Sequence, residues 1–250
     1  SGILLSISSL PSPYGIGTLG REAYNFVDLL GDLKQKYWQV LPVGPTIFGD
    51  SPYQPSSGCA GNIYFIDLDK LVDEGLLEKE EILGYNWGTD ESEIDYAALH
   101  QNRCRILQKA FERFDTNAQE FQDFVKKQSE WLEQYALFMT LKTDNLYKNW
   151  SEWPSEYRNP QTVALEKYQK KNYNTITFWK FCQYKFFEQW EDLKNYANSK
   201  GVYIIGDISF YVGYDSVDVW AERQLFMMSA NDTPEYVAAA GPDKYSESGQ

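Results

Sequence analysis

The first part of the chain places a helical segment between two apolar runs, and this order restricts the fold more than any other feature. Residues 2–7 (GILLSI) and 37–43 (YWQVLPV) are short apolar runs that predict buried strands. Between them, apolar residues over 21–34 recur at helical spacing. A strand, a helix and a second strand in this order predict a βαβ unit, and therefore a parallel sheet or barrel.

A loop rich in proline, glycine and polar residues follows each of these predicted strands. The second loop contains Asp50, Ser51, Tyr53 and Gln54. Carboxylate and amide groups bind hydroxyls, a tyrosine ring flanks the apolar face of a sugar, and prolines lower the entropy lost on fixing a loop. These residue types favour a sugar ligand, although such a loop taken alone is more typical of ordinary surface. For the first loop, residues 8–20, two interpretations are open with equal weight: a rigid structural turn, or a loop that lines an active site.

Composition excludes several classes of function. A formal net charge of -13 argues against nucleic acid, whose phosphates are bound by clustered Lys and Arg. The chain has no long apolar run, which argues against a membrane partner. Cys59, Cys104 and Cys182 are odd in number and form no CxxC, so neither a disulfide framework nor a zinc site is predicted and a reducing cytoplasm fits. The only histidine, His100, cannot by itself supply a His-based metal site or a Ser/His/Asp triad.

The middle of the chain predicts mainly helices. Apolar residues recur at intervals of three and four over 96–114, 117–141 and 175–199, and these stripes are most simply core faces. A further short strand is predicted at 63–68, followed by a small helix at 69–75. We therefore expect a helical insertion between the second strand of the barrel and the next.

Residues 202–207 (VYIIGD) predict the third strand of the barrel, which ends in Asp207. A carboxylate at the carboxyl end of a strand is placed to project into a barrel mouth, although it could instead cap or brace the next loop. Asp215 and Asp218 follow, and we expect them to be N-cap and first-turn residues of a helix. Residues 225–250 predict a polar loop.

Three long motifs, in this order and at this spacing, resemble one enzyme family. They are SSLPSPYGIGTLG, PVGPTIFGDSPYQ and GDISFYVGYDSVDVWA. The chain is similar over essentially its whole length to the amylomaltase or 4-alpha-glucanotransferase family of disproportionating enzymes. The resemblance implies an α/β fold, part of a (β/α)8 TIM barrel with a large inserted helical subdomain. It also implies transfer of α-1,4-glucan segments between maltooligosaccharides by a retaining mechanism, without a cofactor or metal.

The resemblance also implies a set of substrate-binding residues. Ser51 and Tyr53 match the family's DSPYQ loop, and Asp207 matches the aspartate at the end of its GD(I/L/M)P strand. Asp243, Gly249 and Gln250 match its lid loop and the GQ that follows. In the family the catalytic nucleophile and acid/base lie on later strands, and no stretch here resembles the RIDHFRG-like motif. The chain is therefore expected to be an N-terminal half without the family's catalytic carboxylates.

Several residues depart from the family's pattern. Ser6 stands where the family usually has His, Cys59 and Ile63 stand within its AFAGNP motif, and Ser209 replaces a proline. Lys244 replaces an aromatic residue of the lid loop. These changes fall on loops more than on strands. The change at Lys244, together with the loss of the prolines that the family has just before it, is expected to affect water exclusion and loop stiffness.

We expect three parts in the chain. Residues 1–83 form the first βα units of the barrel with the substrate loop. Residues 84–200 form the mainly helical insertion and a helix of the barrel, and residues 201–250 form the third strand and the lid loop. Two alternatives remain open: a non-catalytic glucan-binding module or inactive fragment, and a structural domain in which all the aromatics are core.

Overall fold

The computed structural model describes residues 1–46, 50–90, 92–160, 162–237 and 241–242. Its described strands form one parallel sheet in the order β1-β2-β3. The strands are β1 (Gly2–Leu4), β2 (Tyr37–Gln39) and β3 (Tyr203–Ile205). The predicted parallel arrangement of the three segments is therefore confirmed, although each strand is shorter than its apolar run.

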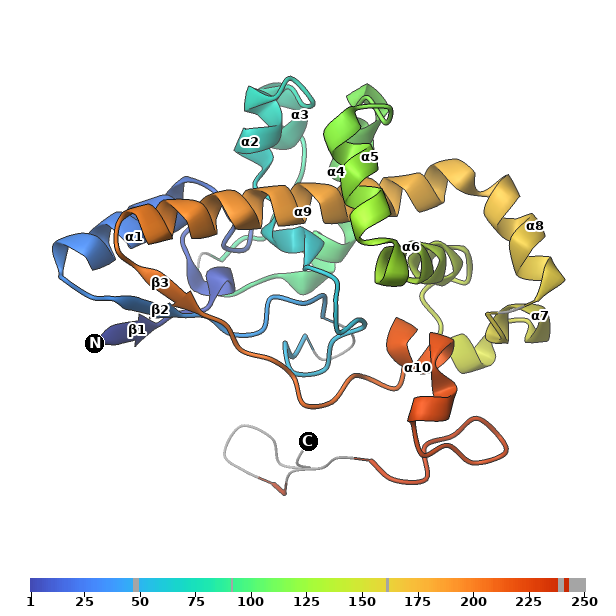
Figure 1. Ribbon diagram of the computed structural model, residues 1–250. Coiled ribbons are helices and arrows are strands. Elements are labelled where there is room, and N and C mark those ends of the chain that lie inside the picture. The colour runs from blue at the N-terminus through green and yellow to red at the C-terminus, as the bar shows by residue number, and fades with distance from the viewer. Residues whose placement is uncertain (47–49, 91, 161, 238–240, 243–250) are drawn as a thin grey trace.

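The sheet is covered on one face only. Trp38 is fully buried, and its ring centroid lies 4.9 Å from that of Phe26 in α1 (Arg21–Asp32). On the opposite face Leu4 and Ile205, which occupy one row of the register, are 55% and 44% exposed. The prediction of buried strands is therefore wrong for this face in the described chain, because the helices pack against the other side of the sheet (Figure 1).

The helices are arranged around α9 (Tyr173–Ser199), which confirms the long helix predicted at 175–199. Figure 1 shows the sheet near one end of α9, and α7 and α8 near the other. Helices α1, α4, α5, α6 and α8 all contact α9, so the core runs along its length. The remaining helices are α2 (Leu68–Asp73), α3 (Lys79–Leu83), α4 (Tyr96–Arg113), α5 (Gln119–Lys127), α6 (Ser129–Asp144), α7 (Ser155–Arg158), α8 (Val163–Lys171) and α10 (Val217–Ala221).

The helix predicted at 117–141 is two helices, α5 and α6. The break falls at Gln128, whose backbone (φ -100°, ψ 8°) leaves the helical range. The apolar stripe nevertheless continues across it, since Phe121, Leu132 and Phe138 are all fully or almost fully buried. Side-chain burial thus follows the predicted period even where the backbone changes direction.

The strand predicted at 63–68 is wrong. Residues 63–65 form a 3₁₀ turn, and α2 follows at once. Asn62 Oδ1 accepts a hydrogen bond from Tyr64 N at 2.9 Å, and Asp67 Oδ1 accepts one from Lys70 N at 3.1 Å. Side chains of Asn and Asp that cap backbone N–H groups offer the chain an alternative to strand pairing, so two short polar residues override the apolar run.

Two buried glutamines of α9 fasten this segment to the long helix. Gln183 Oε1 accepts from Gly61 N at 2.8 Å, and its Nε2 donates to Gly61 O at 3.0 Å. In the same way, Gln189 Oε1 accepts from Asp67 N at 2.7 Å, and Gln189 Nε2 donates to Asp67 O at 3.2 Å. Both glutamines are at most 1% exposed. Because buried polar groups require partners, these pairs fix the segment that follows residues 50–58 on α9.

We expect stability to fall in acid through Glu81. Arg113 donates to both of its carboxylate oxygens, at 2.7 and 3.1 Å, and Glu78 N donates at 3.0 Å. These contacts lower the pKa of Glu81 from 4.5 to about 2. A depressed pKa in the folded state stabilises the fold above pH 4.5, and this contribution is lost as the pH falls toward 2.

A Glu81→Gln variant checks this expectation. Because Arg113 is partly solvent-exposed, the variant should lose only about 1 kcal/mol of unfolding free energy at pH 7. The difference from the unsubstituted chain should disappear near pH 2 in denaturant titrations. A loss of equal size at both pH values would contradict the assigned pKa.

Candidate sugar-binding site

Two residues predicted from separate motifs meet in the structure. The Tyr53 hydroxyl donates a hydrogen bond to Asp207 Oδ2 at 2.7 Å. This bond raises the pKa of the Tyr53 hydroxyl, because the neighbouring carboxylate disfavours the tyrosinate. The Tyr53 side chain is nevertheless 45% exposed, so its ring remains open to a ligand. Asp207 therefore does brace a loop, and the loop is the one that carries Tyr53.

Ser51 shapes the turn in front of Tyr53. Its Oγ accepts a hydrogen bond from Tyr53 N at 3.3 Å, and its carbonyl accepts one from Gln54 N at 3.2 Å. Asp50 has a left-handed backbone with φ 53°, a conformation in which Asp is among the better tolerated side chains. The short polar residues of the motif thus produce a tight turn that presents Tyr53.

Further contacts join this turn to the segment after β3. We call residues 50–58 the tyrosine loop and residues 207–218 the aspartate loop. Ser209 Oγ donates to Pro52 O at 3.1 Å. Two backbone bonds continue the series: Gly213 N donates to Pro55 O at 3.2 Å, and Val217 N donates to Ser56 O at 2.9 Å. The tyrosine and aspartate loops are therefore one hydrogen-bonded unit.

Helix α10 ends the aspartate loop and corrects one prediction. Its N-cap is Ser216, whose Oγ accepts from Val219 N at 3.2 Å, so Asp215 is not the cap. Asp218 lies in the first turn as expected. The sequence interpretation of Asp215 failed because a serine directly before the helix is an equally good cap.

Asp215 instead forms an ion pair with a buried lysine. Its Oδ2 accepts from Lys142 Nζ at 2.5 Å, and its Oδ1 accepts from Trp150 N at 3.2 Å. Lys142 is 6% exposed and also donates to the carbonyls of Tyr147 and Lys148. A buried ammonium that is paired and hydrogen-bonded in this way ties the aspartate loop to the end of α6. The stripe pattern gave no signal for it, since Lys142 stands on a helix interpreted as an apolar face.

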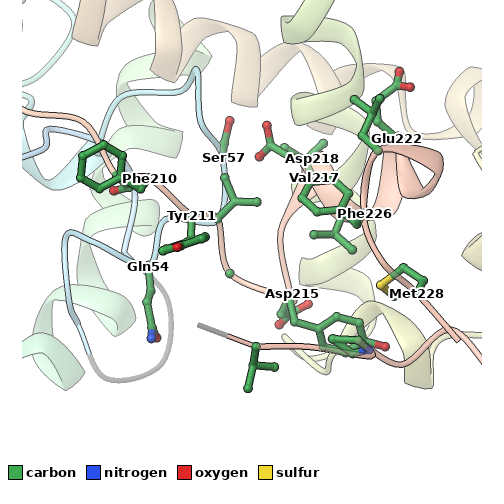
Figure 2. A pocket seen from close by; sticks show the side chains of 18 of the residues that line it. Gln54, Ser57, Phe210, Tyr211, Asp215, Val217, Asp218, Glu222, Phe226 and Met228 are labelled. Carbon is green, nitrogen blue, oxygen red and sulfur yellow. The ribbon is translucent and has the colours of Figure 1, made fainter. Parts of the chain in front are cut away.

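The two loops form one side of an open groove with a volume of about 1030 Å³. This volume is slightly above the range of roughly 300–1,000 Å³ that is usual for small-molecule sites, which favours an oligomeric ligand over a single ring. In Figure 2, Gln54 and Tyr211 lie at the left of the view, and Glu222 and Phe226 lie at the right. The aromatic lining residues are Tyr53, Trp131, Phe210, Tyr211, Tyr214, Phe226 and Tyr236, and the polar ones include Gln54, Ser57, Gln134, Asn149, Asp218 and Glu222.

The other predicted site residues lie outside the described part of the chain. Asp243, Gly249 and Gln250 belong to residues 243–250, as does the departure at Lys244. Within the described residues, Cys59 is an exposed free thiol that lines the groove, and Ile63 is buried in the core.

The residues that the structure describes contain no group of three or more His, Cys, Asp or Glu side chains that could hold a metal ion. A search of the same residues finds no helix that is long and apolar enough to cross a membrane.

Comparisons with known proteins agree with one another. A sequence profile described as 4-alpha-glucanotransferase matches residues 5–250. A 4-alpha-glucanotransferase of Clostridium butyricum is 42% identical over 248 residues, which cover 98% of this chain and 51% of the relative. One of Streptococcus pneumoniae is 44% identical over 255 residues, covering 100% of this chain and 50% of the relative. This chain thus spans about half the length of these curated relatives.

Solved structures give the same result for the fold. The amylomaltase from Streptococcus agalactiae in complex with acarbose matches with a TM-score of 0.92 and 40% sequence identity. The match covers 100% of this chain and 51% of that one. An amylomaltase from Corynebacterium glutamicum, at 19% identity and a TM-score of 0.67, shares the fold. The similarity therefore extends over every part of the chain described above.

Proposed function

Since this chain belongs to the 4-alpha-glucanotransferase family, we propose that it is part of an enzyme that transfers α-1,4-glucan segments between maltooligosaccharides. The observation that carries the proposal is the Tyr53–Asp207 contact, because it brings an exposed aromatic ring and a carboxylate together beside a groove of oligosaccharide size. Support for the ligand class comes from the acarbose complex of the Streptococcus agalactiae relative.

We assign complementary binding roles to the described site residues. Tyr53 supplies an aromatic face on which the C–H face of a sugar ring can pack. Asp207 uses Oδ2 to hold Tyr53, and an ionised carboxylate has further lone pairs that can accept from a sugar hydroxyl. Ser51 supplies a hydroxyl at the same turn. By resemblance, Asp243, Gly249 and Gln250 complete the binding wall.

The reaction we propose is a retaining transfer. It requires a carboxylate nucleophile and a carboxyl acid/base roughly 5 to 5.5 Å apart, and it passes through a covalent glycosyl-enzyme intermediate. We place both carboxyl groups on strands that follow the three described here. The residues of this chain would then bind the glucan, orient it, and present the acceptor hydroxyl while the aromatic wall excludes water.

We also propose that the three strands belong to a closed (β/α)8 barrel. The exposed face that carries Leu4 and Ile205 supports this, because an apolar sheet face is normally covered, and in a barrel it would point inward. In this arrangement residues 1–83 and 201–250 contribute to the barrel and its loops, and residues 84–200 form the inserted helical part together with a barrel helix. Helix α9 fits the barrel helix, because it contacts α1 and β3. All three cysteines are free, which supports a reducing, cytoplasmic location.

Substitutions of Tyr53 test the binding role. Loss of the ring in Tyr53→Ala should weaken maltotriose binding by about tenfold, since stacking on one aromatic side chain contributes about 1 kcal/mol beyond the area it buries. Tyr53→Phe keeps the ring and should lose about threefold or less. Isothermal titration of the protein at its full natural length measures both. Tyr173→Ala is the matched control, because Tyr173 is 66% exposed and does not line the groove.

An assay for glucose released from maltotriose separates the two forms of the proposal. Binding together with glucose release indicates a transferase, whereas binding alone indicates a non-catalytic glucan-binding module. If Tyr53→Ala and Tyr173→Ala bind maltotriose equally well, Tyr53 is not part of the site.

A further inference from the structure

Asp218 makes the last of the hydrogen bonds between the tyrosine and aspartate loops. Its Oδ2 accepts from Gly58 N at 3.0 Å. The other end of the loop pair is held by the Tyr53–Asp207 contact. Between these ends the contacts use backbone atoms or, in one case, the Ser209 hydroxyl. Asp218 is therefore the carboxylate that closes the loop pair on the side away from Tyr53.

The surroundings of Gly58 show why this bond matters. Pro55, Ser56 and Ser57 are buried, whereas Gly58 and Cys59 are exposed. On the other side of Gly58, the Ser57 hydroxyl accepts a hydrogen bond from Cys59 N at 3.2 Å, so the Cys59 amide finds its acceptor within the same segment. At Gly58 itself the donor is a backbone N–H at an exposed turn, and Asp218 comes from a different element to accept it.

The Asp218 carboxylate and the Gly58 amide also suit each other electrostatically and sterically. Burial raises the pKa of Asp218, and the Gly58 N–H opposes that shift by stabilising the charged form. A hydrogen bond to an ionised acceptor is stronger than one between neutral groups. Gly58 leaves room for it, since a Cβ at this position would lie 3.3 Å from Asp218 Oδ1.

We propose that Asp218 is a positioning residue for glucan binding. It holds the tyrosine loop through Gly58, and so keeps the loop that carries Tyr53 in position before the glucan binds. The inference rests on the proposed function, because it assigns a role in the same groove. A loop that is ordered before the ligand arrives loses less entropy on binding. Releasing Gly58 should therefore weaken glucan binding with little effect on the chemical step.

The experiment compares Asp218→Ala with Asp218→Asn in the protein at its full natural length. Asp218→Ala should raise KM for maltotriose about tenfold, with kcat changed less than about twofold. It should also speed hydrogen exchange of the Gly58 amide in the sugar-free protein about tenfold or more, because that amide loses its acceptor. Asp218→Asn keeps an acceptor oxygen and should restore most of both values.

Asp115→Ala is the matched control. Asp115 also accepts a backbone N–H, from Asn117 at 2.9 Å, but it lies between α4 and α5 and does not line the groove. An unchanged KM in Asp218→Ala overturns the inference. A raised KM with unchanged Gly58 exchange also overturns it, because Asp218 would then contact the sugar directly. If the unsubstituted protein neither binds nor converts maltotriose, the proposed function fails, and the exchange data still decide whether Asp218 holds Gly58.

Discussion

Replacing Asp207 with alanine is expected to lower glucan transfer by at least about tenfold. The substitution removes the acceptor of the Tyr53 hydroxyl and, by our proposal, an acceptor for a sugar hydroxyl. A hydrogen bond to a charged group contributes about 1.5–3 kcal/mol, and each 1.4 kcal/mol corresponds to about tenfold. Two such losses at one carboxylate make this the largest expected effect on activity among the described residues.

Initial rates of maltotriose disproportionation by the protein at its full natural length measure the effect. Asp207→Asn keeps the shape and one acceptor oxygen, so it should retain more activity than Asp207→Ala. Asp192→Ala is the control, since Asp192 is an exposed carboxylate of α9 whose partner is Lys70, 3.7 Å away. A rate for Asp207→Ala equal to that of the control would remove Asp207 from the site.

The contact also predicts how two substitutions combine. The Tyr53→Phe change removes the hydroxyl that donates to Asp207, so part of its effect should disappear in an Asp207→Ala background. Residues in direct contact typically show interaction energies of about 0.5–3 kcal/mol in such cycles. Fully additive losses would show that the 2.7 Å contact does not operate in the sugar complex.

The meeting of Tyr53 and Asp207 could be predicted in part from the sequence. Each follows an apolar run, and the carboxyl ends of parallel strands lie at the same edge of a sheet, so nearness followed from the βαβ order. The partner atoms did not follow, because a loop's turn geometry depends on local bonds such as Ser51 Oγ to Tyr53 N. The bond from Ser209 to Pro52 also lay beyond prediction, since it joins two loops with no shared pattern.

Elements whose form depends on tertiary contacts were the least predictable. Residues 63–68 have the composition of a strand, but Asn62 and Asp67 cap the backbone at both ends. In addition, Gln189 of α9 binds the backbone N–H and C=O of Asp67. The helices predicted at 96–114 and 175–199 were predicted well because their apolar period persists over many residues, whereas the same period at 117–141 gave no sign of the break at Gln128. The polar members of those helices, Gln183 and Lys142, found partners far along the chain, which periodicity does not encode.

The largest expected effect on stability comes from Gly61→Ala. A Cβ at Gly61 would lie 2.0 Å from Cδ1 of Phe186, well inside contact distance. Phe186 is 1% exposed in α9, so its ring has little room to move. Displacing Gly61 would also break the pair of hydrogen bonds with Gln183, and a buried group left without a partner costs about 1–3 kcal/mol. Together with overpacking of about 1–3 kcal/mol, we expect a loss of about 3 kcal/mol or more.

Gly31→Ala is the matched control for this substitution, with an expected effect of the opposite sign. Gly31 is the last but one residue of α1, and a Cβ added there would lie 4.0 Å from Lys200 O, so the methyl group fits. Alanine is favoured over glycine by about 0.5–1 kcal/mol in a helix interior, and in this last turn we expect a gain of up to about 0.5 kcal/mol. Denaturant titrations of both variants measure the two changes. A Gly61→Ala variant as stable as the parent would mean that α9 does not pack closely against the segment after the tyrosine loop. The hydrogen bonds between Gln183 and Gly61 could not then fix the position of that segment.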